Sequence, residues 1–177
     1  MGPIPEHCAR DDLEERYKAV NVSKKIRANW KARGEACMET DHVVGTHPQG
    51  LTMTADINTQ YDHPGEYVGR RICAHAVQSP HIEKQLTPQE IFDAFFGSGQ
   101  HDVDDDSRLL VPDGMSARAY AAQIMRQQLS ETTGADYSEA GDAEFTDSLM
   151  YNVAPSMSFW GGFYQNTVYR FRPNGLD

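Results

Sequence analysis

The chain has 177 residues, of which 39% are hydrophobic, and this size fits one globular domain with a core of its own. Its 26 acidic and 16 basic side chains leave a formal net charge of −10, which disfavours nucleic acid and anionic membranes as partners. No apolar run approaches the roughly 20 residues of a membrane span, and residues 1–10 lack the basic and then apolar order of a secretory signal. We therefore expect a cytoplasmic protein.

The three cysteines, Cys8, Cys37 and Cys73, are odd in number, and none belongs to a C-x-x-C pair. This pattern predicts neither a disulfide framework nor a zinc or iron–sulfur site. A reducing compartment suits such a set of thiols.

The first half of the chain predicts two helices and one strand. The longest helix candidate covers residues 28–46, although Gly34 weakens its middle by about 1 kcal/mol relative to alanine. Residues 67–77 have the composition of a strand. Residues 87–97 begin with a Thr-Pro-Gln-Glu capping box and continue with apolar residues at helical spacing, so they predict a short helix that ends at Gly97.

The second half predicts a loop, a helix and two strands. Four of the seven residues 101–107 are Asp, so we interpret this segment as a solvated loop. Residues 116–130 contain no Gly or Pro and favour a helix. Residues 149–153 and 167–172 favour strands, the second with an alternation of aromatic and cationic side chains. Together these elements predict an α+β fold.

The last residues predict a hairpin turn. Asn174-Gly175 follows a strand, and this dipeptide is the strongest short signal for a two-residue turn. Only Leu176 and Asp177 follow, which leaves no returning strand and an unpaired edge. We therefore expect the fold to be incomplete at the C-terminus and the chain to be part of a longer parent.

Chemistry-bearing residues concentrate between residues 35 and 47. Glu35, Glu39 and Asp41 are acidic, and His42 and His47 are the two histidines of this segment. Imidazole nitrogen binds Zn, Fe, Cu and Ni, and two histidines with one carboxylate are typical of non-haem Fe(II) oxygenases. From the residues alone, however, such histidines are more often solvated or hydrogen-bonded surface groups than ligands. Glu39 is likewise more often a helix-surface acid, or a partner of Lys31 or Arg33, than a group that supports a metal ligand.

Helical geometry sets a condition on the metal site. In an unbroken helix His47 lies about 140° around the axis from His42. Both imidazoles reach one metal only if the helix distorts or ends near Gly45. Pro48 favours such an ending, because the residue before a proline is pushed out of the helical region.

The whole string resembles the large-subunit signature of Rieske-type aromatic-ring-hydroxylating oxygenases. The matching residues are Asn29-Trp30-Lys31, Glu35, Glu39, His42 and His47-Pro48-Gln49. The resemblance implies that His42 and His47 are ligands of a mononuclear iron and that Glu39 is the acid that connects a ligand histidine to the Rieske cluster of a neighbouring subunit. Residues 19–25 and 154–175 resemble other parts of the same catalytic domain.

The resemblance also implies a fold and an activity. The fold is the helix-grip (START-like) type, a curved antiparallel sheet around a long helix, with Phe159 lining the pocket of an aromatic substrate. The activity is hydroxylation or cis-dihydroxylation of that substrate with O2 at Fe(II). Electrons come from NAD(P)H through a reductase, in some systems a ferredoxin, and a 2Fe-2S Rieske cluster. The implied assembly is a homo-oligomer, in some systems with a small subunit.

The chain departs from the family pattern at several points. Asp41 stands where an aromatic residue is usual, and Cys37 where a Phe is usual. A Rieske domain needs both a C-x-H and a C-x-x-H pair, and the chain lacks this combination. The third iron ligand of the family is an Asp beyond the turn at Asn174-Gly175, so residues 1–177 are expected to be a partial catalytic domain.

Two alternatives to catalysis by this chain stay open. The first is a helix-grip domain that only binds an apolar ligand. The second is a truncated gene product. The sequence does not identify the substrate or distinguish mono- from dioxygenation.

Overall fold

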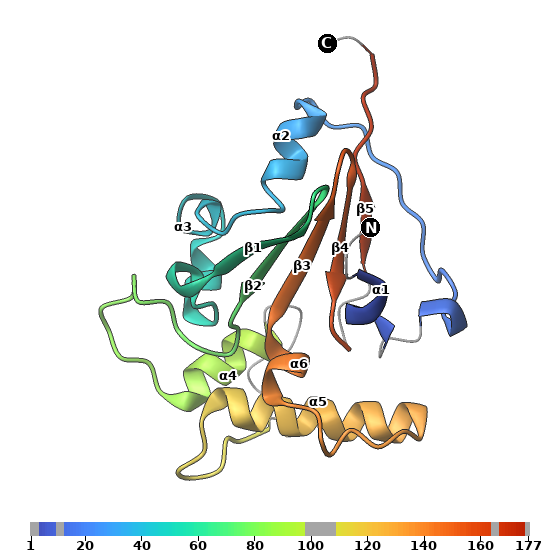
Figure 1. The fold of residues 1–177 in the computed structure, drawn as a ribbon. Helices are drawn as coiled ribbons and strands as arrows, with labels where there is room; N and C mark the ends of the chain where they lie inside the picture. Colours follow the sequence, from blue (N-terminus) through green and yellow to red (C-terminus); the bar gives the residue numbers. More distant parts are fainter. Residues whose placement is uncertain (1–3, 10–12, 98–108, 164–166, 176–177) are drawn as a thin grey trace. The chain divides into compact units, whose positions relative to one another are not determined.

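The computed structural model describes residues 4–9, 13–97, 109–163 and 167–175, and the chain forms two compact units (Figure 1). Unit 1 contains Met1–Thr40, Gln60–Ile72 and Ser148–Asp177. Unit 2 contains Asp41–Thr59 and Cys73–Asp147. The chain therefore passes between the units four times, and each unit is built from segments that are distant in sequence.

Unit 1 is built on a β-sheet. Within the described residues the sheet has five strands in the order β1-β2-β3-β4-β5. Their bounds are Gln60–Gly65, Val68–Cys73, Ser148–Val153, Met157–Gly161 and Val168–Arg170. The pairings of β1 with β2, β3 with β4 and β4 with β5 are antiparallel. The predicted α+β class is confirmed at this level.

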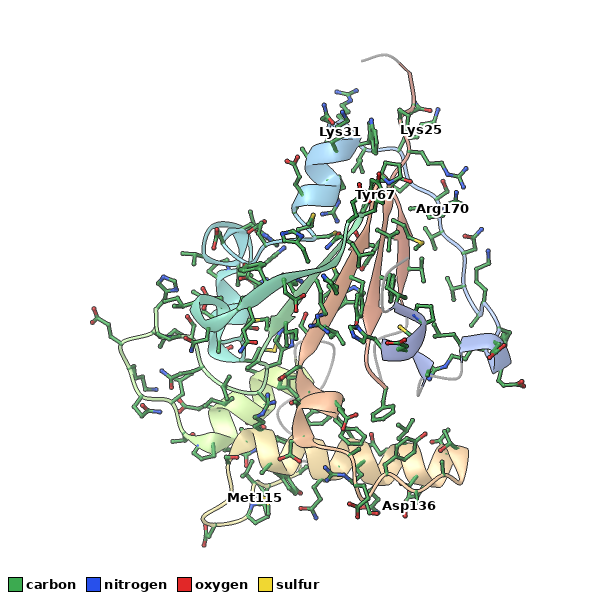
Figure 2. The ribbon with its side chains drawn as sticks, viewed as in Figure 1. Lys25, Lys31, Tyr67, Met115, Asp136 and Arg170 are labelled. Atoms are coloured by element: carbon green, nitrogen blue, oxygen red, sulfur yellow. The ribbon has the colours of Figure 1, made fainter. Side chains whose placement is uncertain are left out.

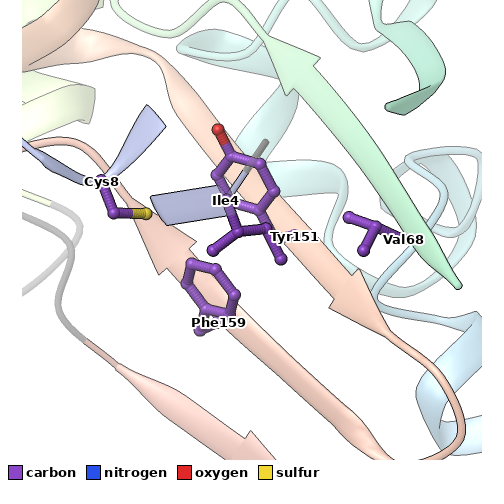
Figure 3. Close-up of a cluster of buried hydrophobic side chains, with 5 residues drawn as sticks. All are labelled: Ile4, Cys8, Val68, Tyr151 and Phe159. Atoms are coloured by element: carbon purple, nitrogen blue, oxygen red, sulfur yellow. The ribbon is translucent and has the colours of Figure 1, made fainter. Parts of the chain in front are cut away.

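One face of the sheet carries the apolar core of unit 1. Successive side chains of a strand point to opposite faces, and Val68, Tyr151 and Phe159 share one of them. The short helix α1 (Ile4–His7) packs there through Ile4 and Cys8 (Figure 3). Two further segments of unit 1 are the 3-10 helix η2 (Leu13–Glu15) and α2 (Trp30–Glu35).

The opposite face meets the segment that follows α2. Arg71 lies three positions after Val68 on β2, so its side chain points to the opposite face. Its Nη1 donates to the carbonyl oxygen of Glu39 at 2.8 Å. The hydroxyl of Tyr61 on β1 lies 3.1 Å from the backbone N–H of Thr40, which donates to it, and 3.0 Å from the Thr40 hydroxyl. These contacts tie residues 39–40 to the sheet.

The continuous helix predicted for residues 28–46 is wrong. The structure has α2 (Trp30–Glu35) and α3 (His42–Thr46), separated by a turn over residues 36–41. Asn29 caps α2 by accepting a hydrogen bond from the N–H of Lys31 at 2.9 Å. Gly34 lies in the last turn of α2, and the bonds that hold Glu39 and Thr40 on the sheet compete with helix continuation.

Unit 2 is helical in its described residues. Its elements are α3 and the 3-10 helices η3 (Pro48–Thr52) and η4 (Asp56–Asn58), followed by α4 (Pro88–Gly97), α5 (Ala117–Thr133) and α6 (Asp142–Thr146). A hydrophobic cluster forms between α4 and α5, in which Phe92 packs with Ala117 and Ala121. In the part of the chain that the structure describes, no helix has the length and apolar character needed to cross a membrane.

Both helices predicted in unit 2 are confirmed. At the start of α4, Glu90 accepts from the N–H of Thr87 at 2.7 Å, and Thr87 accepts from the N–H of Glu90 at 3.2 Å, which is a capping box. Ser116 caps α5 by accepting from the N–H of Ala119 at 3.1 Å. Gly134 ends α5 with a φ of 74°, a left-handed conformation that favours glycine.

The predicted strands are confirmed in place but differ in length. Residues 67–77 contain β2, which ends at Cys73, and residues 167–172 contain the shorter β5. Residues 149–153 match β3 within one residue. The loop predicted for residues 101–107 lies outside the described residues.

Candidate functional site

His42 and His47 lie at the two ends of α3. His42 is its first residue, and the Thr46 hydroxyl donates to the His42 carbonyl oxygen at 2.7 Å. His47 caps the C-terminal end with φ −132° and ψ 48°, outside the helical region, while its N–H still donates to the carbonyl oxygen of Val43 at 2.9 Å. Pro48 follows and excludes a helical conformation at His47. The helix end expected near Gly45 is therefore present.

The two imidazoles are neighbours. Their ring centres lie 5.4 Å apart with an interplanar angle of 78°, His42 half-buried and His47 exposed. Two imidazoles bound to one metal through nitrogens at about 2.1 Å have ring centres roughly 5 Å apart. The distance between the two ring centres is thus close to that of two imidazoles on one ion.

A complete ligand set is not assembled in the described residues. Among them, no three His, Cys, Asp or Glu side chains are grouped so that they could hold a metal ion. In the part of the chain that the structure describes, the histidine pair of α3 therefore has no third such side chain grouped with it.

Glu39 belongs to unit 1, whereas both histidines belong to unit 2. The Glu39 backbone is fixed by Arg71, whose guanidinium also lies 5.5 Å from the ring centre of Trp160. The Glu39 side chain is half-buried and close enough to Cys37 to influence its thiol. The backbone of Glu39 is thus anchored to the sheet by Arg71, and this bond does not involve the Glu39 carboxylate.

Cys37 is buried and interacts with Ser158. Burial raises the pKa of the Cys37 thiol, and the charges of Arg33 and Arg71 only partly oppose this effect. Cys37 therefore remains a protonated thiol and acts as a small, weakly polar core residue.

Phe159 is part of the apolar core of unit 1. It is 9% exposed and stacks on Tyr151, with ring centres 4.9 Å apart and an interplanar angle of 14°. Ile4 and Cys8 pack on the same cluster (Figure 3). Trp160, the next residue on β4, lies on the other face with Arg71. The Phe159 side chain therefore lies on one face of the sheet, and the segment that carries Glu39 packs on the other face.

The structure also has a cavity in unit 1 that the sequence did not indicate. It measures about 360 Å³ and borders α2, the β1–β2 hairpin, the β3–β4 turn and Phe171. Lys31 and Tyr67, labelled in Figure 2, are two of its lining residues. One feature of the sequence could have indicated this cavity. Asn152 is a polar residue between Tyr151 and Val153 on a strand that is otherwise mostly apolar.

Comparison with known proteins assigns no family to the chain. No family model, no curated protein and no solved structure matches it. The resemblance over residues 29–49 and the geometry of α3 are therefore what a functional proposal rests on.

Proposed function

We propose that this chain belongs to the catalytic part of a Rieske-type aromatic-ring-hydroxylating oxygenase, in which His42 and His47 hold a mononuclear Fe(II). The observation that carries the proposal is the end of α3 at Thr46, which leaves the two imidazoles with ring centres 5.4 Å apart. Imidazole binds several metals, and we propose iron because the sequence of residues 29–49 resembles the oxygenase signature. Iron bound there would activate O2 for hydroxylation or cis-dihydroxylation of an aromatic substrate.

The chain's own residues hold and orient the site. Pro48 keeps His47 out of the helix, and the Thr46 bond to the His42 carbonyl closes the single turn between the ligands. Glu39 is proposed as the acid that serves electron delivery from the Rieske cluster. Arg71 supports this role by fixing the backbone at Glu39. The electron source is NAD(P)H, through a reductase and in some systems a ferredoxin.

The proposal includes the helix-grip fold and a substrate pocket at Phe159. An antiparallel sheet and a long helix are what this fold needs, and unit 1 supplies the sheet while α5 has 17 residues. The flat Tyr151–Phe159 pair offers an aromatic surface on which a planar substrate could stack, but only after Ile4 and Cys8 move away from it. Assembly into a homo-oligomer, with or without a small subunit, and a cytoplasmic location complete the proposal.

The proposal is tested by anaerobic addition of Fe(II) to the labelled 177-residue chain, with the histidine ring resonances observed by NMR. We expect paramagnetic broadening first at His42 and His47. The matched control is His63, an exposed histidine of β1 outside the pair, whose ring should broaden only at much higher Fe(II).

Variants sharpen the test. His42→Ala and His47→Ala should each abolish selective binding without unfolding the chain, because neither residue belongs to the two core clusters described above. His63→Ala should leave binding unchanged. Equal broadening of all histidines, or equal loss in His63→Ala, would show that α3 holds no iron and would favour the rival function of an apolar-ligand binder.

A further inference from the structure

We propose that the cavity of unit 1 is a binding site for a small, neutral carbonyl compound with a flat apolar body, whose carbonyl oxygen accepts a hydrogen bond from Asn152. The site is formed by residues of unit 1 alone and does not depend on the iron function proposed above. Its volume of about 360 Å³ lies at the low end of the range of about 300–1,000 Å³ found for small-molecule pockets.

The walls of the cavity suit a flat apolar body. Trp30 and Met38 border it from α2 and the turn after it, Tyr67 from the β1–β2 hairpin, and Phe171 from the segment after β5. Aromatic side chains offer large faces for stacking against a planar molecule. Gly34 borders the cavity beside Phe171, where its missing side chain leaves space.

Asn152 supplies the polar group of the site. Its side chain borders the cavity and is only 8% exposed. Its Oδ1 accepts a hydrogen bond from the hydroxyl of Ser158, its cross-strand partner on β4. Its Nδ2 is buried, and none of the described residues offers it a hydrogen-bond acceptor. Because buried polar groups are almost always hydrogen-bonded, this amide points to an acceptor that the protein itself does not provide.

The bond between Ser158 and Asn152 determines which end of the amide is left over. The hydroxyl of Ser158 donates its hydrogen to Oδ1 of Asn152. The remaining group of Asn152 is an NH2, so the ligand atom that pairs with it is an acceptor.

The charges around the cavity disfavour an anion. Glu35, Glu66 and Lys31 border the cavity, so its acidic side chains outnumber its basic one, and β1 contributes His63 to the lining. A carboxylate ligand would be repelled, whereas a ketone, ester or amide would not.

Met38 is an adaptable side chain of the cavity wall. A Cβ at Gly69 would lie 2.8 Å from the Met38 Cε, so the end of this side chain lies over the sheet at Gly69. Methionine is unbranched and adapts its shape readily. In the proposed complex the cavity wall adjusts, Met38 included, so that a ligand oxygen reaches the buried Nδ2 of Asn152.

The proposal is tested with two probes of nearly the same shape. Acetophenone carries a carbonyl oxygen, and α-methylstyrene carries a CH2 group in its place. Each is titrated into the labelled 177-residue chain while the side-chain amide of Asn152 and the indole of Trp30 are observed by NMR. Acetophenone should shift both signals and bind about three- to tenfold more tightly, as the gain of one hydrogen bond implies.

Variants test the role of the amide. Asn152→Leu, which is similar in size but has no donor, should bind both probes equally. Asn58→Leu, at an exposed asparagine of unit 2, should keep the preference for acetophenone. Should Asn152→Leu fail to fold, the two-probe comparison with the unmodified chain still decides. Equal affinity of that chain for the two probes, an unshifted Asn152 amide, or no binding of acetophenone up to its solubility limit would each overturn the proposal.

Discussion

His42 is the first residue of α3 and His47 is its C-cap, and their ring centres lie 5.4 Å apart. This arrangement depends on a helix of only five residues. In a continuous helix the same two side chains would diverge by about 140°. The short distance between the two rings therefore depends on what ends the helix, and Pro48, which follows His47, favours this ending.

Pro48→Ala should weaken this arrangement. Without the proline ring, His47 is free to adopt helical angles, and its imidazole then rotates away from His42. We expect the NOE between the two rings to weaken and the Fe(II) affinity to fall by roughly tenfold, as for other changes that misorient a ligand. Pro112→Ala, at an exposed proline elsewhere in unit 2, is the control and should change neither quantity. An undiminished NOE in Pro48→Ala would mean that other contacts end α3.

Glu90 should give α4 a pH-dependent stability. The backbone N–H of Thr87, then Lys84 and then the Thr87 hydroxyl, lower the pKa of Glu90 from an ordinary 4.5 to about 2. Because the pKa is lower in the folded state, the stabilisation is complete above about pH 4.5 and is lost as the pH falls through about 2. Glu90→Gln should therefore be less stable than the unmodified chain at neutral pH.

The measurement is urea unfolding as a function of pH. The stability difference between Glu90→Gln and the unmodified chain should shrink between pH 4.5 and pH 2, where Glu90 itself becomes neutral. Glu83→Gln, at an exposed position shortly before α4, should be as stable as the unmodified chain at neutral pH. A pH-independent difference for Glu90→Gln would mean that the carboxylate charge is not what stabilises the capping box.

Arg71→Met should destabilise unit 1. Arg71 is 7% exposed, bonds the Glu39 carbonyl at 2.8 Å and lies over the ring of Trp160. Loss of a charged hydrogen bond and of a cation–π contact should lower the free energy of unfolding by about 2–3 kcal/mol. Arg71→Lys keeps the charge but loses the planar fork, so its loss should be intermediate. If Arg71→Met unfolds at the same urea concentration as the unmodified chain, the guanidinium does not anchor this segment.

Local signals predicted α4 and α5 of unit 2 well, whereas α6 was not predicted. The capping box at Thr87 and the uninterrupted composition of residues 116–130 are properties of neighbouring residues, and they are independent of tertiary contacts. The strands 149–153 and 167–172 were found for the same reason. Part of β4 was anticipated only through the family resemblance of residues 154–160, and β1 was not anticipated, since its Asp, His, Pro and Gly residues have low strand propensity.

The prediction of one helix over residues 28–46 was wrong because tertiary contacts override local helix propensity. Nothing local shows that the Glu39 carbonyl will bond Arg71, 32 positions along the chain, or that Thr40 will bond Tyr61. The histidine pair could be proposed from sequence since both members and Pro48 lie within seven residues. The cavity at Asn152 could not, because its walls come from four segments that only the fold brings together.

Phe159→Ala should distinguish the packing role of Phe159 from a purely ligand-lining role. In the described structure Phe159 stacks on Tyr151 and contacts the cluster that includes Ile4 and Cys8. Removing a buried aromatic ring should lower the free energy of unfolding by about 3–5 kcal/mol, and Phe159→Leu, which keeps most of the volume, should cost clearly less.

The matched control is Val168→Ala, at the β5 residue that pairs with Phe159 across the strands and is 62% exposed. Because its side chain is largely in solvent, this change should cost less than about 1 kcal/mol. Urea unfolding of the three variants measures the differences. A Phe159→Ala chain as stable as Val168→Ala would mean that α1 and Tyr151 do not close over Phe159 in solution. The ring would then be free to line a ligand pocket without first displacing Ile4 and Cys8.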